Sequence, residues 1–249
     1  MTSSWYFVGV LLGLGMVVQA AKLPNTWGRC SRKDKDFAEC IRKNLEIAIR
    51  SLNKPIPELG LASCDPLNIP GLYIGEGKGA VNVAQDFKNV KLHGISNAVV
   101  YNSSFDFEKK EMIAESLSPE LRLEADYTMK GQVLLLPIVG NGPCNVTLVN
   151  MRIKHKMNFE YIEKKGKTYM KALDFKVTMN PEKVLFKFDN LFDGQNKELG
   201  TTVNKVLNDN SLEVFNDVRN GYEISFGEIF KDLCNRVFHK VPVKDIFLV

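Results

Sequence analysis

The sequence has few of the residues from which metal sites and enzyme active sites are built. Its three histidines, at positions 93, 155 and 239, have no second histidine or cysteine at metal-ligand spacing. The GxSxG, HExxH and protein-kinase motifs are absent. Gly75, Gly77 and Gly79 precede a strand-like stretch, which indicates a turn or strand bend and not a phosphate-binding loop. We therefore expect no metal, no cofactor and no enzymatic activity.

Long apolar runs and interdomain linkers are also scarce. Residues 1–20 carry no charged side chain, contain the apolar run Trp5–Leu14 and end in Val18-Gln19-Ala20. They predict a cleaved secretory signal peptide, with a retained membrane anchor as the alternative. No later stretch is apolar enough for a membrane helix, and no linker divides residues 21–249. We expect one domain, secreted into an extracellular fluid such as haemolymph.

Basic residues are not concentrated on any one segment. The net charge is +4, and the only lysine clusters, Lys109–Lys110 and Lys164–Lys167, fall where hairpin turns are expected. Binding to nucleic acid needs a basic face with aromatic platforms, so we expect none. The expected partner is a hydrophobic small molecule, with a cell-surface receptor as a further candidate, and we expect a monomer.

The chain has five cysteines, which invite pairing in an exported protein. Cys30 and Cys40 flank a short polar segment, and a disulfide between them would join the N-terminal loop to the first helix. Cys64, Cys144 and Cys234 remain, so at least one thiol stays unpaired; its expected fate is burial.

Two glycosylation motifs accompany the export signal. Asn102-Ser-Ser and Asn145-Val-Thr have the acceptor pattern. We expect Asn102 and Asn145 as candidate glycan sites.

An unusually long alternating segment runs from Thr147 to Tyr161. Its odd positions form a largely apolar face and its even positions a polar one, over roughly twice the usual strand length. Such a strand fits a curled sheet better than a flat one. His155 occupies the apolar face; we expect a buried histidine bonded to a neighbour, with a ligand contact or a general base as the alternatives.

Shorter alternating segments surround the long one and predict an antiparallel meander with one apolar face. The expected strands cover 121–130, 132–138, 169–179 and 184–188, and the expected turns lie at Gly131, Gly140–Pro143 and Glu163–Lys167.

Helical periodicity occupies both ends of the chain. Asp36–Leu52 has an amphipathic pattern, a short helix is expected over 199–207, and apolar residues recur at three and four positions from Leu212 to Val237. Gly221 and Gly227 lower the propensity of this long helix and suggest a kink. The resulting α+β architecture is a strongly curved antiparallel sheet wrapped around a long C-terminal helix, which leaves an elongated apolar space.

Short motifs along the mature chain resemble the insect takeout and juvenile-hormone-binding protein family. They are the Cys30/Cys40 pair, IPELG at 56–60, PLNIP at 66–70, LLPIVGNGP at 135–143, LFDG at 191–194, VLND at 206–209 and the tail 242–247. The resemblance implies the tubular lipid-binding (TULIP) fold of bactericidal permeability-increasing protein (BPI), with an apolar tunnel. Cys144, Ser211 and the segment 219–221 depart from the family pattern, which leaves the identity of the ligand open.

The expected function is a non-enzymatic carrier of a juvenile-hormone-like terpenoid, a fatty acid or a quinone. The alternatives are an interaction module with a filled core and a lipid esterase. Tyr127, Tyr161 and Tyr222 offer hydroxyl groups to an ester or epoxide oxygen. Ordinary core packing is the alternative for every candidate tunnel residue. The candidates are Tyr127, Met129, Met151, Met157, Phe159, Tyr161, Phe175, Val177, Phe186, Phe188, Phe215, Tyr222, Phe226 and Phe230.

Ligand entry requires a movable end. We expect it either at the N-terminal segment around Cys30 and Cys40 or at the tail after Pro242.

Overall fold

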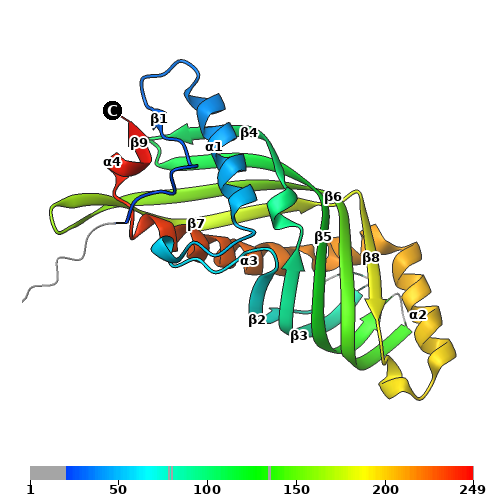
Figure 1. The fold of residues 1–249 in the computed structure, drawn as a ribbon. Helices are drawn as coiled ribbons and strands as arrows, with labels where there is room; N and C mark the ends of the chain where they lie inside the picture. Colours follow the sequence, from blue (N-terminus) through cyan, green and yellow to red (C-terminus); the bar gives the residue numbers. More distant parts are fainter. Residues whose placement is uncertain (1–20, 78, 80, 134–135, 249) are drawn as a thin grey trace, which may run out of the picture.

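The computed structural model describes residues 21–77, 79, 81–133 and 136–248. The predicted signal peptide, residues 1–20, lies outside the described residues. The largest element is a seven-stranded antiparallel sheet in which β5 and β6 are the longest strands (Figure 1). Its strands are β2 (Leu67–Ile74), β3 (Val81–His93), β4 (Val99–Asp106), β5 (Glu111–Val133), β6 (Leu136–Lys164), β7 (Lys167–Asn180) and β8 (Lys183–Phe188).

The helices confirm the expected α+β architecture. In the described part of the chain, none of them is both long enough and apolar enough to cross a membrane. Two short strands, β1 (Cys30–Ser31) and β9 (Phe247–Leu248), form a separate parallel pair. The helices are α1 (Phe37–Ser51), α2 (Lys197–Asp209), α3 (Ser211–Phe238) and α4 (Val243–Ile246), with single 3₁₀ turns η1 (Pro57–Leu59), η2 (Ile95–Asn97) and η3 (Phe192–Gly194).

The two long strands bend together where Pro119 of β5 lies opposite Asn150 of β6. Asn150 has a positive φ of 46°, a conformation that asparagine tolerates better than most residues. On one side of the bend the strand order is β4-β5-β6-β7, and on the other it is β2-β3-β5-β6-β8. One pair of strands therefore supports two half-sheets that face different directions.

The bend also switches the side of each strand that faces the core. In β6 the buried residues are even-numbered before it and odd-numbered from Met151 onward. The predicted apolar face is therefore correct from Met151 onward and wrong for Thr147 and Val149, because Val146 and Leu148 are buried in their place.

Two of the predicted turns are wrong. β5 continues through Gly131, and Gly140–Pro143 lies inside β6. At Gly131 a Cβ atom would stand 2.1 Å from the carbonyl oxygen of Asn82, so glycine is needed for the close approach of β3 and not for a turn. The turn predicted at Glu163–Lys167 is confirmed.

The predicted simple meander also needs correction at β7 and β8. β8 pairs with β6 and not with β7. In β7 the register against β6 shifts after Asn158, so that Ala172 is buried and Leu173, expected on the apolar face, is 48% exposed.

The long helix α3 lies inside the bend and contacts β2, β3, β7 and β8, which belong to both half-sheets (Figure 1). Its buried face includes Phe215, Tyr222 and Phe226. A Cβ atom on Gly227 would approach the carbonyl oxygen of Phe175 to 2.4 Å. The helix continues through Gly221 and Gly227, and Gly227 allows its backbone to rest directly on β7.

Amide side chains of the helices pair with backbone groups at the free edges of the sheet. Asn204 and Asn208 of α2 each accept a hydrogen bond from one β8 residue, Phe188 and Phe186 respectively, and donate one to the same residue. Asn235 of α3 does the same at Ala172 of β7, with N···O distances of 2.8 and 3.1 Å. These bonds replace the strand that would otherwise satisfy each edge.

We expect Asn235→Ala to lower the free energy of unfolding by about 1–3 kcal/mol, because the Ala172 N–H and C=O lose their partners. Urea denaturation measures the change. Asn220→Ala, on the exposed face of the same helix, is the matched control and should leave stability unchanged or slightly raised. Equal effects of the two substitutions would contradict the proposed role of the amide.

Candidate ligand-binding cavity

An apolar cavity of about 210 Å³ lies in the core between α1, α3 and the half-sheet β4-β5-β6-β7. Leu45 and Ile49 from α1, Phe230 and Leu233 from α3, and Phe175 from β7 form much of its wall. The lining residues of each helix are three or four positions apart, so the amphipathic pattern of the helix places them on one face. We call this space the central cavity.

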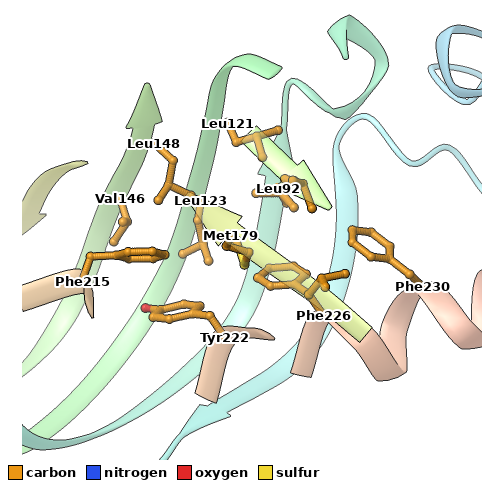
Figure 2. A pocket seen from close by; sticks show the side chains of 12 residues that line it. Leu92, Leu121, Leu123, Val146, Leu148, Met179, Phe215, Tyr222, Phe226 and Phe230 are labelled. Atoms are coloured by element: carbon orange, nitrogen blue, oxygen red, sulfur yellow. The ribbon is translucent and has the colours of Figure 1, made fainter. Parts of the chain in front are cut away.

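Smaller cavities adjoin the central cavity at both ends. Toward β1 and β9 lies an end cavity of about 150 Å³, which shares Leu45 and Met112 with the central cavity. In the other direction a narrow space of about 20 Å³ shares Leu92 and Phe230 with it and continues beside α3 (Figure 2). Leucine, valine, methionine and aromatic side chains surround this narrow space. The three cavities thus follow α3 in a row.

A pair of hydrogen-bonded polar side chains borders the central cavity. Ser116 of β5 and His155 of β6 lie 3.2 Å apart, Oγ to Nε2. The rings of Phe175 and Phe230 pack edge-on against the imidazole, with centroids 5.9 and 5.7 Å away. Burial away from water lowers the pKa of His155 to about 4, so the ring is neutral at pH 7. The expected hydrogen bond of His155 to a neighbour is confirmed, and the residue is half-buried.

The structure distributes the fourteen predicted lining residues over several places. Phe175 and Phe230 border the central cavity, and Tyr161 borders a cleft at the surface. Val177, Phe215, Tyr222, Phe226 and again Phe230 line the narrow space, and Met129, Phe186 and Phe188 line a space of about 20 Å³ near β8. Met151, Met157 and Phe159 are buried in the packed wall, as is Tyr127.

Two of the three tyrosine hydroxyl groups are already engaged. Tyr127 donates to the carbonyl oxygen of Asp189 at 2.6 Å, and Tyr222 donates to Gln85 at 3.3 Å. The buried hydroxyl of Tyr161 has no hydrogen-bond partner among the described residues.

The sequence interpretation missed the contribution of α1 and of the small residues of β5. Leu45, Ile49 and Leu52 line the central cavity, as do Ala114 and Ser116. The i, i+4, i+7 spacing of the three α1 residues was visible, but the pattern does not say which surface the helix covers.

The β1–β9 pair borders the end cavity through Cys30 and Phe247. Cys30 pairs with Phe247 in this small sheet, and Cys30 forms the predicted disulfide with Cys40 of α1. The guanidinium of Arg32 lies over Phe107, 4.2 Å from the ring centroid, and near Phe247. Phe247 lines both the end cavity and an outer cleft of about 390 Å³, so it separates the interior from the surface.

The other three cysteines are free thiols. Cys64 and Cys144 are buried and Cys234 is half-buried. Burial raises the pKa of the Cys144 and Cys234 thiols to about 12, so neither is a thiolate at neutral pH. Among the described residues, no group of three or more histidine, cysteine or acidic side chains could hold a metal ion.

The model of the family described as haemolymph juvenile hormone binding protein (JHBP) matches residues 7–248. The chain belongs to this family. A circadian clock-controlled protein daywake from Drosophila yakuba and another from Drosophila melanogaster are each 24% identical to it over 250 residues, covering 97% of this chain and 95% of theirs.

A solved structure shows the same fold. Takeout 1 of Epiphyas postvittana superposes with a TM-score of 0.79 at 24% identity, covering 89% of this chain and 99% of that chain. The resemblance to the takeout and juvenile-hormone-binding family, inferred from the short motifs, is confirmed.

The low pKa of His155 predicts a pH dependence of stability. Because its folded-state pKa of about 4 lies below the ordinary histidine value of 6.5, the unfolded chain binds more protons between these values. The free energy of unfolding therefore falls as the pH falls from 6.5 to 4, by up to about 3 kcal/mol from this residue.

Urea titrations at several pH values measure this loss. In His155→Gln the side chain keeps a hydrogen-bonding group but cannot take up the proton. The loss of unfolding free energy at low pH should therefore be smaller by the part that His155 contributes. Parallel curves for the two proteins would contradict the assignment.

Proposed function

We propose that the protein is a secreted, non-enzymatic carrier that holds a small lipophilic ligand between α3 and the curved sheet. The observation that carries this proposal is the central cavity of about 210 Å³ in the middle of the core. Empty apolar volume destabilises a protein by about 24 cal/mol per Å³, so such a cavity would cost about 5 kcal/mol if unfilled. A ligand that fills it offsets that loss.

The lining indicates the kind of ligand. An engineered apolar cavity of about 150 Å³ already binds benzene, and the central cavity is larger and has neighbours at both ends. Each buried methylene contributes about 0.8 kcal/mol, so a fifteen-carbon chain provides about 12 kcal/mol before association costs. A juvenile-hormone-like terpenoid, a fatty acid or a quinone fits this description, and the family name supports the first.

The row of cavities supports a tunnel as the binding site. Adjacent cavities share wall residues, including Leu45 and Met112 on one side and Phe230 on the other. Rotamer changes at these shared residues would join the cavities along α3. The predicted lining residues Val177, Phe215, Tyr222 and Phe226 would then contact the ligand beyond the central cavity.

Several features support secretion. The first 20 residues have the pattern of a signal peptide, and the Cys30–Cys40 disulfide suits an oxidising compartment. Asn102 is exposed, whereas Asn145 is half-buried, so Asn102 is the more accessible glycan site. We propose a monomer in an extracellular fluid such as haemolymph, with a cell-surface receptor as a candidate partner.

The structure favours the carrier over the two alternatives. An interaction module with a filled core would not need the central cavity. An esterase would need the Ser116–His155 pair to act as nucleophile and base, but no acidic side chain is bonded to His155 among the described residues.

Mass spectrometry of lipids extracted from the natively purified protein tests the function. We expect a bound lipid in the wild type and little in Ala114→Leu, which places three extra carbons in the central cavity. The unliganded variant should be at least as stable as the wild type. Ala62→Leu, at an exposed loop position, is the matched control and should keep its lipid. A wild-type protein without lipid, which also fails to bind a fluorescent apolar probe, would overturn the carrier function.

The β1–β9 pair joins the two segments expected to gate entry, so we propose that they act as one lid. Replacing Cys30 and Cys40 by serine removes the tie between β1 and α1 and should raise the dissociation rate of a bound fluorescent probe several-fold. Stopped-flow dilution measures the rate. Cys144→Ser, which changes a thiol in β6 near β8, is the control. An unchanged rate in the double variant would rule out this lid.

A further inference from the structure

Ser116 and His155 place a polar pair in a cavity whose walls are otherwise almost entirely apolar. They come from neighbouring strands of the sheet, where Ser116 pairs with Ile153 and His155 pairs with Ala114. Each of these strands also has a second neighbour, so the backbone of both residues lies within the sheet. Their side chains border the central cavity next to Phe175 and Phe230.

His155 is half-buried and borders the central cavity. Its hydrogen bond with Ser116 is the only one that the ring makes among the described residues. Ser118 lies two residues farther along β5, on the same side of the strand, and also borders the cavity. Its hydroxyl makes no hydrogen bond among the described residues.

The hydrogen-bonding capacity of the pair exceeds what the pair uses. A neutral imidazole has one N–H donor and one acceptor nitrogen, and a serine hydroxyl has one donor and two acceptor sites. If Nε2 accepts from Ser116, the Nδ1–H remains as a donor. If Nε2–H donates to Ser116, the serine O–H remains as a donor. Either tautomer leaves one unused donor beside the cavity.

An unused donor in an apolar environment is unfavourable, and an acceptor on a ligand removes the penalty. The acceptor must be uncharged. No lysine or arginine lines the central cavity, and a carboxylate there would be a buried charge without a counter-ion. The carbonyl oxygen of an ester or a ketone accepts a hydrogen bond and carries no charge, so it meets both requirements.

We propose that Ser116 and His155 form a polar anchor that hydrogen-bonds an uncharged carbonyl oxygen of the ligand. This proposal rests on the carrier function and narrows it: the anchor selects carbonyl-bearing lipids such as esters and quinones over ionised fatty acids. The hydrocarbon part of the ligand then extends along α3 into the adjoining cavities.

Methyl laurate and pentadecane have equal numbers of non-hydrogen atoms and test the anchor as a pair. Their dissociation constants are measured by displacement of the fluorescent probe N-phenyl-1-naphthylamine from the full-length mature protein. In Ser116→Ala and in His155→Leu, we expect methyl laurate to bind about 5- to 20-fold more weakly and pentadecane to change less than twofold.

Two further variants separate recognition from structure. His155→Gln keeps a donor and an acceptor near the same place and should retain most of the affinity for the ester. Ser103→Ala removes a buried hydroxyl that donates to the carbonyl oxygen of Ala38 and does not line the central cavity, so it should change the affinity for neither methyl laurate nor pentadecane. Thermal melting of each variant confirms that it is folded.

Each of the other possible results of these measurements would overturn a different part of the proposal. Equal weakening of the ester and the alkane would remove the anchor while leaving the carrier function in place. Laurate ion that binds as tightly as methyl laurate would remove the selection for uncharged ligands. Release of methanol from the ester would make Ser116 a nucleophile instead of an anchor. If the wild type binds neither methyl laurate nor pentadecane, the carrier function itself fails.

Discussion

The structure depends on how the free edges of a strongly bent sheet are satisfied. Among the described residues, β8 and β7 have no further strand beside them where they meet α2 and α3, and asparagine side chains of those helices supply the missing donors and acceptors. Each amide reaches only a few ångströms, so it fixes its helix close to one edge of the sheet. α3 is thereby held close to β7, where a Cβ atom on Gly227 would lie 2.4 Å from the Phe175 carbonyl oxygen. The central cavity lies between this helix, α1 and the half-sheet β4-β5-β6-β7.

The elements with strong periodicity were predictable from the sequence, and those that depend on pairing were not. The helix from Leu212 and the apolar face from Met151 onward follow directly from residue spacing. The bend at Asn150 could not be read in the same way, because both faces of β6 near that point carry apolar residues and the position of Pro119 opposite it depends on strand pairing. Gly131 and Gly140 look like turn residues in sequence, yet both lie inside strands, where a Cβ atom would lie 2.1 Å from the Asn82 carbonyl oxygen and 2.7 Å from the Tyr127 hydroxyl, respectively.

The candidate site shows the same division. Aromatic residues of β7 and α3, such as Phe175 and Phe230, were accessible to pattern reasoning because each lies on an apolar face. The pattern cannot distinguish a residue that packs against another from one that faces a void, since both require the same hydrophobic side chain. Met151 and Met157 illustrate this limit, because they are buried as firmly as any cavity-lining residue. His155 was the exception: a polar residue on an apolar face was already visible in the sequence.

The bend shared by β5 and β6 also helps to set the register of the two strands of the long hairpin. A hairpin with unbroken alternation can slip by two residues and still present apolar side chains to the interior. Here Pro119 and Asn150 lie opposite each other, and each strand changes its buried side at this point. In a slipped hairpin the position where β5 changes its buried side would no longer lie opposite the position where β6 does. Polar side chains of one strand would then face the core over the stretch between the two mismatched bends. The bend thus specifies the register of the two strands and disfavours hairpins that are shifted by two residues. This matters more for strands of 23 and 29 residues than for short ones.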